Sequence, residues 1–254
     1  MLSKQGLFLL PNLLDKTSSS LELFPSLMLA LVPGLDGLIA ESEKEGRIFL
    51  RRFFIQKEGS CRDLPIAVLN EHSTASDLAL LVQRIKKGGK WGLISDAGLP
   101  VIADPGADLV FCCHREKVAV YPLPGPSALF YALMLSGFSA QNFTFSGYLP
   151  REESSLQRKI KALENQLRKE KQTQVFIETP YRTLKLLRIL LQQLSPATYL
   201  AVAWNVTWPN EGVRVRSVAD WRRLPMEVPS KALAVFLLGV PCLQQEREKS
   251  SALF

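Results

Sequence analysis

The stretch LISDAGLPVIADPG, residues 93–106, contains two closely spaced turns at the end of an apolar run. The first turn is Ser95-Asp96-Ala97-Gly98, and the second is Asp104-Pro105-Gly106. Small residues let backbone N–H and C=O groups approach a ligand closely, and turns aim several amides at one point. An ordinary connection also uses Asp, Gly and Pro, because turns favour these residues. We interpret the stretch as a candidate ligand-binding loop, with the ordinary connection as the alternative.

Two further segments combine a predicted strand end with the start of a predicted helix. In PLPGPSAL, residues 122–129, the prolines fix the backbone and Ser127 is placed to cap the following helix, alone or beside a ligand. In VFIETPYR, residues 175–182, Glu178 is either a ligand contact or a surface carboxylate. Neither segment decides between its two interpretations by itself.

Two carboxylates are candidates for general-base chemistry. Glu41 and Glu43 stand directly after the apolar run 38–40, where a predicted strand ends. A charged, solvated helix start is the plainer account of both residues. We identify no Ser/His/Asp set and no Cys/His pair, and the chain has neither a GxGxxG nor a GK[ST] string.

The chain has 254 residues, a net charge of +7 and a pI of about 9.3. This length fits two domains of about 100–150 residues. The charge favours an anionic partner such as nucleic acid, although many other proteins are equally basic. Four cysteines without a CxxC pair and only two histidines argue against a zinc site and for a reduced, cytoplasmic protein. No stretch reaches the roughly 18 apolar residues of a membrane span.

Basic residues cluster in three places, and the first cluster consists of Arg47, Arg51 and Arg52. The neighbouring aromatic residues Phe49, Phe53 and Phe54 are candidates for stacking on bases. Their helical spacing favours a buried core instead, and most runs of charge are solvated faces.

Apolar runs of strand length alternate with helical patterns in the first half of the chain. This rhythm predicts a parallel or mostly parallel α/β sheet that is covered on both faces. The first half is expected to hold strands at 6–10, 38–40, 65–69, 91–94 and 117–122, with helices at 21–32, 77–87 and 108–114. The second half is expected to hold helices at 154–170 and 181–194, with strands at 174–178, 199–207, 214–217 and 232–238. We place the domains at residues 1–122 and 123–254.

Four strings, LISDAGLPVIADPG, PLPGPSAL, NFTFSGYLPRE and VFIETPYR, resemble in order and spacing the tetrapyrrole methylase superfamily. The similarity is greatest to its ribosomal RNA small subunit methyltransferase I branch and extends from Gly6 to about Leu238. It implies an α/β fold of two domains, each with a mixed or mostly parallel sheet flanked by helices. It also implies S-adenosylmethionine in the cleft between the domains, a homodimer, and RNA as the partner.

The resemblance further implies a set of site residues. Those expected to contact the cofactor or support its loop are Pro11, Ser95, Asp96, Ala97, Gly98, Leu99, Ile102, Ser127, Ala128, Glu178, Pro180, Asn205 and Val206. The reaction is an in-line transfer of the sulfonium methyl group, which depends on positioning and requires no metal. A ribose hydroxyl as acceptor needs a base, for which Glu41 is the candidate, with Glu43 behind it.

Several substrate-side strings depart from the branch. The TPIGNL-like loop is LPNLLD, the EDTR-like segment is ESEK, the ESPHR-like string is ETPYR, and the RELTK-like string is WNVTW. Three interpretations therefore stay open: an RNA methyltransferase acting on a ribose oxygen, a methyltransferase for a tetrapyrrole-like small molecule, and a catalytically silent protein that binds the cofactor.

Overall fold

The computed structural model describes residues 4–18, 21–53 and 63–241, and the chain divides into two compact units, Met1–Ser127 and Ala128–Phe254. The division lies at the end of the connection between β5 (Val120–Pro122) and α5 (Ala128–Ser136), and the domain boundary expected after residue 122 lies at its start. Phe54, Cys61 and Cys242 are outside the described residues.

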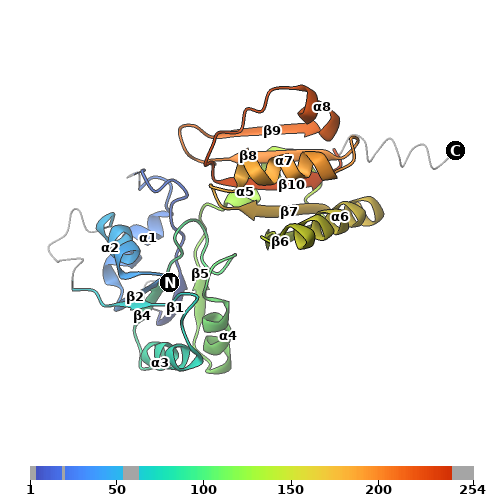
Figure 1. Ribbon diagram of the computed structural model, residues 1–254. Helices are drawn as coiled ribbons and strands as arrows, with labels where there is room; N and C mark the ends of the chain where they lie inside the picture. The colour runs from blue at the N-terminus through green and yellow to red at the C-terminus, as the bar shows by residue number, and fades with distance from the viewer. Residues whose placement is uncertain (1–3, 19–20, 54–62, 242–254) are drawn as a thin grey trace. The chain divides into compact units, whose positions relative to one another are not determined.

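The first unit is built on a five-stranded sheet with the strand order β3-β2-β4-β1-β5 (Figure 1). Its other strands are β1 (Gly6–Leu9), β2 (Gly37–Ala40), β3 (Ile66–Val68) and β4 (Lys90–Leu93). Every neighbouring pair is parallel. The parallel sheet predicted from fully apolar strands is thus confirmed.

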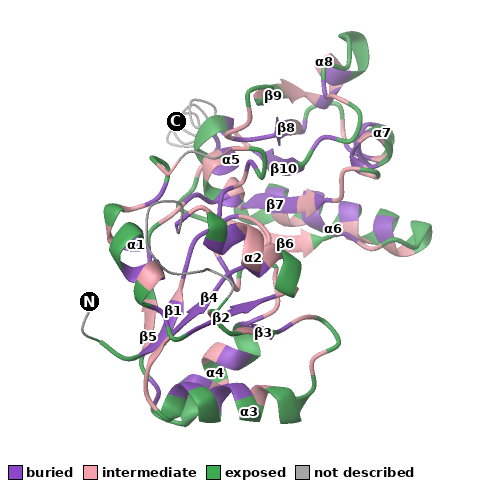
Figure 2. Cartoon of the chain, turned by 90° about the vertical axis from the view of Figure 1, so that its left-hand side faces the viewer, coloured by how far each residue is buried: buried purple, intermediate pink, exposed green. Residues whose placement is uncertain are grey.

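Helices cover both faces of this sheet, as Figure 2 shows. On one face lie α1 (Ser26–Leu31), the short 3-10 helix η1 (Val32–Gly34) and α2 (Glu43–Arg51). On the other lie α3 (Ala75–Lys86) and α4 (Ala107–Arg115). Because side chains alternate along a strand, Phe8 and Leu38 pack under α1 and α2, while their neighbours Leu7 and Ile39 pack against α3 and α4.

Helix α1 is shorter than the predicted helix over residues 21–32. It begins at Ser26, and Pro25 occupies the N-cap position with φ −56° and ψ 138°. A proline inside a helix lacks the N–H that the ladder needs and clashes with the preceding turn. The helix therefore cannot continue back through Pro25 to Leu21.

The second unit holds a mixed five-stranded sheet with the order β6-β7-β10-β8-β9. Its strands are β6 (Phe143–Tyr148), β7 (Thr173–Glu178), β8 (Tyr199–Trp204), β9 (Gly212–Ser217) and β10 (Ala234–Gly239). Only β6 and β7 pair in parallel. Helix α5 packs on one face, and α6 (Glu153–Glu170), α7 (Thr183–Gln193) and α8 (Val218–Arg223) pack on the other.

The sequence pattern did not predict β6 or α8. Most of β6 is only half-buried, and its register with β7 shifts between Phe145 and Tyr148, where Gly147 has a φ of +62°. An edge strand with a bulge gives neither a continuous apolar run nor a regular alternation. Helix α8 has six residues, too few for a helical period to stand out. Within the described part of the chain, no helix is both long and apolar enough to cross a bilayer.

Phe49 of α2 and Phe53 just after the helix belong to the core, as their spacing predicted. Phe49 is fully buried and Phe53 is 8% exposed. Their ring centroids are 5.1 Å apart, and both rings contact Phe24. This aromatic cluster fixes α2 on the sheet and leaves neither described ring available for stacking on a base.

We therefore expect Phe49→Ala to lower the free energy of unfolding by about 3–5 kcal/mol, because it opens a cavity among buried rings. Phe111→Ala removes a ring that is 62% exposed on α4 and should change stability by no more than about 0.5 kcal/mol. Guanidinium unfolding followed by circular dichroism compares the two variants. Equal losses would contradict the assignment of Phe49 to the core.

Candidate functional site

Four loops of the first unit leave the same edge of its sheet. They follow the carboxyl ends of β1, β2, β4 and β5, which are parallel and adjacent. In open α/β sheets, ligands bind beyond this edge. The loop of residues 95–98 follows β4, which lies between β2 and β1, so Glu41 follows one neighbouring strand and Pro11 the other.

Asn12 joins the loops that follow β1 and β4. Its backbone N–H donates to the Gly98 carbonyl at 2.8 Å, and the Gly98 N–H donates back at 3.1 Å. Its side-chain amide donates to the carbonyls of Ser95 at 2.9 Å and Asp96 at 3.2 Å. The residue is only 4% exposed. Asn12 thus sets the path of the 95–98 loop.

Two glycines allow backbones to approach one another at this edge. Gly98 has a φ of +74°, and a Cβ atom there would lie 3.1 Å from Leu14 Cδ2 and 3.3 Å from the Pro126 carbonyl oxygen. A Cβ atom on Gly125 would lie 2.0 Å from Pro11 Cβ. The Pro11 ring therefore rests against the Gly125 backbone, which joins the loop after β5 to the other two.

The backbone between the two turns adopts unfavourable conformations. Val101 has a φ of 77° and Ala103 a φ of 64°. A β-branched residue with positive φ is an outlier, and such strain concentrates at ligand-binding and catalytic sites. This conformation distinguishes the stretch from an ordinary connection.

Three carboxylates gather at the same edge, those of Glu41, Asp96 and Asp104. The Asp96 N–H donates to Glu41 Oε1 at 3.4 Å, and Lys16 Nζ lies 3.0 Å from Asp96 Oδ2. Burial raises the pKa of Asp104 to about 6, with Glu41 and Asp96 adding to the shift. Burial, followed by the charge of Asp96, also raises the pKa of Glu41. The group is suited to a cationic ligand, to hydroxyl donors, or to accepting a proton.

The other predicted residues of the first unit differ in exposure. Ser95, Gly98 and Ser127 are buried, Ala97 and Leu99 are half-buried, and Ile102 is 38% exposed. Glu43 is the first residue of α2, and its exposed carboxylate forms an ion pair with Arg47 at 3.2 Å. Within the described part of the chain, the Glu43 carboxylate pairs with Arg47 and not with a group that contacts Glu41, so its supporting role stays a prediction.

Two predicted residues of the second unit lie at the same edge of its sheet. Glu178 is the last residue of β7, and Asn205 directly follows β8. Ala234 of β10 is opposite both Glu178 of β7 and Trp204 of β8. Glu178 is 3% exposed, accepts from the Thr179 N–H at 2.7 Å, and lies 3.2 Å from the Arg182 guanidinium. These contacts fix its carboxylate in place.

Asn205 closes a turn at this edge. It adopts a φ of 48°, and its side-chain oxygen accepts from the Leu233 N–H at 3.0 Å. Val206 is 8% exposed and packs in the core beneath α5, while Ala128 and Pro180 are half-buried. The roles of these residues toward a ligand stay predictions.

Three residues of the first unit were not selected from the sequence. Asn12 and Lys16 lie in the loop after β1, and Asp104 lies in the second turn of the opening stretch. The sequence offered a signal for Asp104, because an acidic residue stands there in a Pro-Gly turn close to an apolar run. It offered none for Asn12, because the hydrogen bonds of Asn12 depend on strand order. In the described ranges, no group of three or more His, Cys, Asp or Glu side chains is placed to hold a metal ion.

Comparison with known families gives one extended match. Residues 38–221 match the family described as tetrapyrrole (corrin/porphyrin) methylases. The chain is 31% identical over 229 residues to the ribosomal RNA small subunit methyltransferase I of Haemophilus influenzae, covering 90% of this chain and 74% of that protein. It is 36% identical over 158 residues to the protein of the same name from Thermotoga maritima, covering 62% and 66%.

Solved structures share the fold at lower identity. The crystal structure of diphthine synthase matches with a TM-score of 0.63 and 15% identity, over 92% of this chain and 89% of that one. The methyltransferase CobJ matches with a TM-score of 0.57 and 15% identity, over 93% and 94%. These similarities confirm the predicted two-sheet α/β fold.

The raised pKa of Asp104 predicts a pH-dependent stability. The unfolded chain releases this proton near pH 4 and the folded protein near pH 6, so ionisation of Asp104 destabilises the fold as the pH rises through this window. Asp104→Asn should therefore gain stability relative to the parent protein between pH 4 and pH 7, as measured by urea unfolding midpoints.

Asp77→Asn is a control whose change in stability with pH should have the opposite sign. Hydrogen bonds from the Thr74 N–H and hydroxyl lower the pKa of Asp77, so its charge stabilises the fold above about pH 4. This variant should lose stability relative to the parent as the pH rises. A pH-independent difference for Asp104→Asn would contradict the raised pKa.

Proposed function

Because the chain belongs to the tetrapyrrole (corrin/porphyrin) methylase family, we propose that it uses S-adenosylmethionine to methylate small-subunit ribosomal RNA on a ribose 2′-oxygen. The family assignment makes it a methyltransferase with a methyl donor of the S-adenosylmethionine type. The cofactor itself, the RNA substrate and the acceptor atom are the parts that we propose.

The single observation that supports cofactor binding most strongly is the 95–98 loop. Asn12 holds it in place by exchanging backbone hydrogen bonds with Gly98, whose φ is +74°. The small residues of the fixed loop allow a ligand to approach it closely. The half-buried carboxylates of Glu41, Asp96 and Asp104 beside the loop suit a ligand that carries positive charge and ribose hydroxyls.

When bound, S-adenosylmethionine supplies an electrophilic methyl group on a positively charged sulfur. The residues of this chain would bind it, exclude water and orient the acceptor. Glu41 would accept the proton of a ribose hydroxyl. Its raised pKa makes its carboxylate a stronger base than an ordinary surface glutamate.

The choice of RNA rests on the named relatives and on the charge of the chain. The relatives from Haemophilus and Thermotoga are both named ribosomal RNA small subunit methyltransferase I, and this chain carries a net charge of +7. We further propose a cytoplasmic homodimer. The exposed apolar side chains Phe130, Met134 and Leu135 of α5 support self-association.

We expect Gly98→Ala to weaken S-adenosylmethionine binding about tenfold or more, because a Cβ atom at positive φ displaces the loop. Calorimetric titration with S-adenosylmethionine and its demethylated product measures this. Gly34→Ala is the matched control, since a Cβ atom there meets no atom within 4 Å. Equal affinities for both variants would contradict a cofactor site at this loop.

Glu41→Gln should lower turnover on small-subunit ribosomal RNA by about 10²- to 10⁴-fold, because it removes the base, while cofactor affinity stays nearly unchanged. Transfer of a radiolabelled methyl group from S-adenosylmethionine to RNA measures turnover. Unchanged turnover would contradict the role of Glu41. A parent protein that binds the cofactor but methylates no RNA would favour a small-molecule substrate or a catalytically silent protein.

A further inference from the structure

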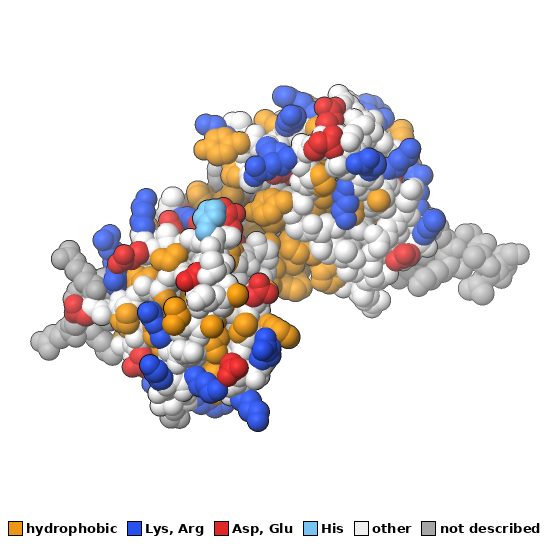
Figure 3. All heavy atoms as spheres, turned by 60° about the horizontal axis from the view of Figure 1, so that its bottom comes forward, with side chains coloured by type: hydrophobic (Ala, Val, Ile, Leu, Met, Phe, Trp, Pro, Cys, Tyr) orange, Lys and Arg blue, Asp and Glu red, His pale blue; other side chains and the backbone are white. Residues whose placement is uncertain are grey.

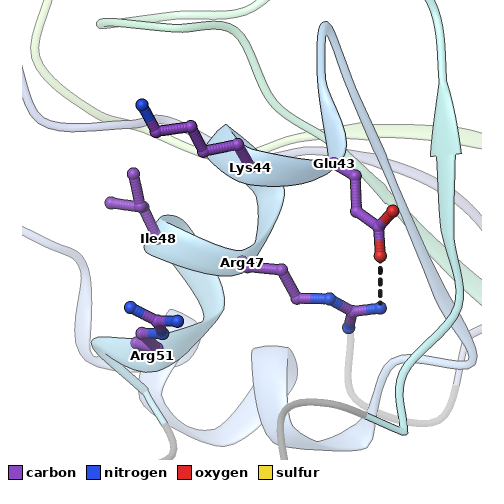
Figure 4. A pocket seen from close by; sticks show the side chains of 5 residues that line it. All are labelled: Glu43, Lys44, Arg47, Ile48 and Arg51. Atoms are coloured by element: carbon purple, nitrogen blue, oxygen red, sulfur yellow. Dashed lines mark hydrogen bonds and ion pairs between the residues drawn. The ribbon is translucent and has the colours of Figure 1, made fainter.

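Helix α2 carries a surface depression on its outer face, lined by Glu43, Lys44, Arg47, Ile48 and Arg51. Figure 4 shows Glu43 and Arg47 paired on one side of the helix, with Lys44, Ile48 and Arg51 following one another along the other. Arg47 also donates to the Leu64 carbonyl at 2.7 Å. Arg47 thus stabilises the fold through these contacts, whereas the exposure of Lys44 and Arg51 needs a separate explanation.

Lys44 and Arg51 are both exposed and form no ion pair or hydrogen bond with another described residue. Seven residues separate them, which is about two helical turns and places them on the same face of α2. The half-buried Ile48 lies between them in the sequence and on that face. This face thus presents two cations, with the apolar Ile48 between them, that no residue in the described part of the chain neutralises.

Charge alone would not single out this face. In the view of Figure 3, Lys and Arg side chains are scattered over the surface of both units rather than gathered into one patch. The position of α2 is what distinguishes it. The helix begins at Glu43, two residues after Glu41, and Arg52 at its end donates to Asn12 Oδ1 at 3.1 Å. Both ends of α2 are therefore tied to the candidate site.

We propose that Lys44 and Arg51 bind the phosphate backbone of the RNA substrate and hold the strand along α2, so that the acceptor ribose reaches Glu41. This inference rests on the proposed function. Cations two turns apart on an exposed helix complement a chain of regularly spaced phosphates.

The test is the double variant Lys44→Ala/Arg51→Ala, titrated with small-subunit ribosomal RNA at several salt concentrations. Its Kd should rise about 5- to 30-fold, since two exposed ionic contacts are lost. The slope of log Kd against log salt should fall by about 1.4, the value for two phosphates of a single strand. The affinity for S-adenosylmethionine should not change, because neither side chain contacts the 95–98 loop.

Arg84→Ala/Lys87→Ala is the matched control. It removes one Arg and one Lys from exposed positions, Arg84 in α3 and Lys87 as the C-cap residue of that helix, which covers the opposite face of the sheet. We expect its RNA affinity and salt slope to stay at the parent values. An equal effect of both double variants, or no effect of the α2 variant while the parent binds RNA, would overturn the inference. A parent protein that binds no RNA would instead overturn the proposed function.

Discussion

The exchange of backbone hydrogen bonds between Asn12 and Gly98 is the constraint on which the candidate site depends. The two loops follow β1 and β4, and they meet because these parallel strands are neighbours in the sheet. Once they are joined, Gly98 must adopt positive φ and must lack a side chain, because Leu14 and Pro126 lie directly beside it. The small residues of the loop are therefore a consequence of this pairing as well as a means of approaching a ligand.

Contacts between these loops also stabilise the carboxylates of Glu41 and Asp96 beside the apolar strands. The Asp96 N–H donates to Glu41, and Lys16 compensates part of the negative charge. Asp104 receives less compensation, and burial raises its pKa to about 6. A buried group with such a shift destabilises the fold near neutral pH, which is typical of positions selected for binding or catalysis rather than for stability.

Much of the fold could be predicted from the sequence, because it depends on local patterns. Fully apolar runs identified β2 and β4, and helical spacing identified α3 and placed Phe49 in the core. The unpredicted β6 is a bulged edge strand without such a pattern. Turn residues in the sequence indicated the 95–98 loop as part of the candidate site, as at Gly98, and its role toward a ligand stays a prediction. The roles of Asn12 and Lys16 could not be predicted, because they depend on contacts between loop residues that are 83 and 80 positions apart in the sequence.

One departure from the family strings, Trp204 in the second unit, has a physical explanation. Trp204, in the altered WNVTW string, is 5% exposed, and a Cβ atom on Gly212 would lie 2.3 Å from its ring. Arg214 lies over the same ring, 5.7 Å from its centroid. Trp204 thus packs where a charged side chain would be costly to bury.

In the ETPYR string, by contrast, Glu178 and Arg182 form an ion pair. The altered position Trp204 therefore serves packing, which separates it from the loop of the first unit that supports cofactor binding.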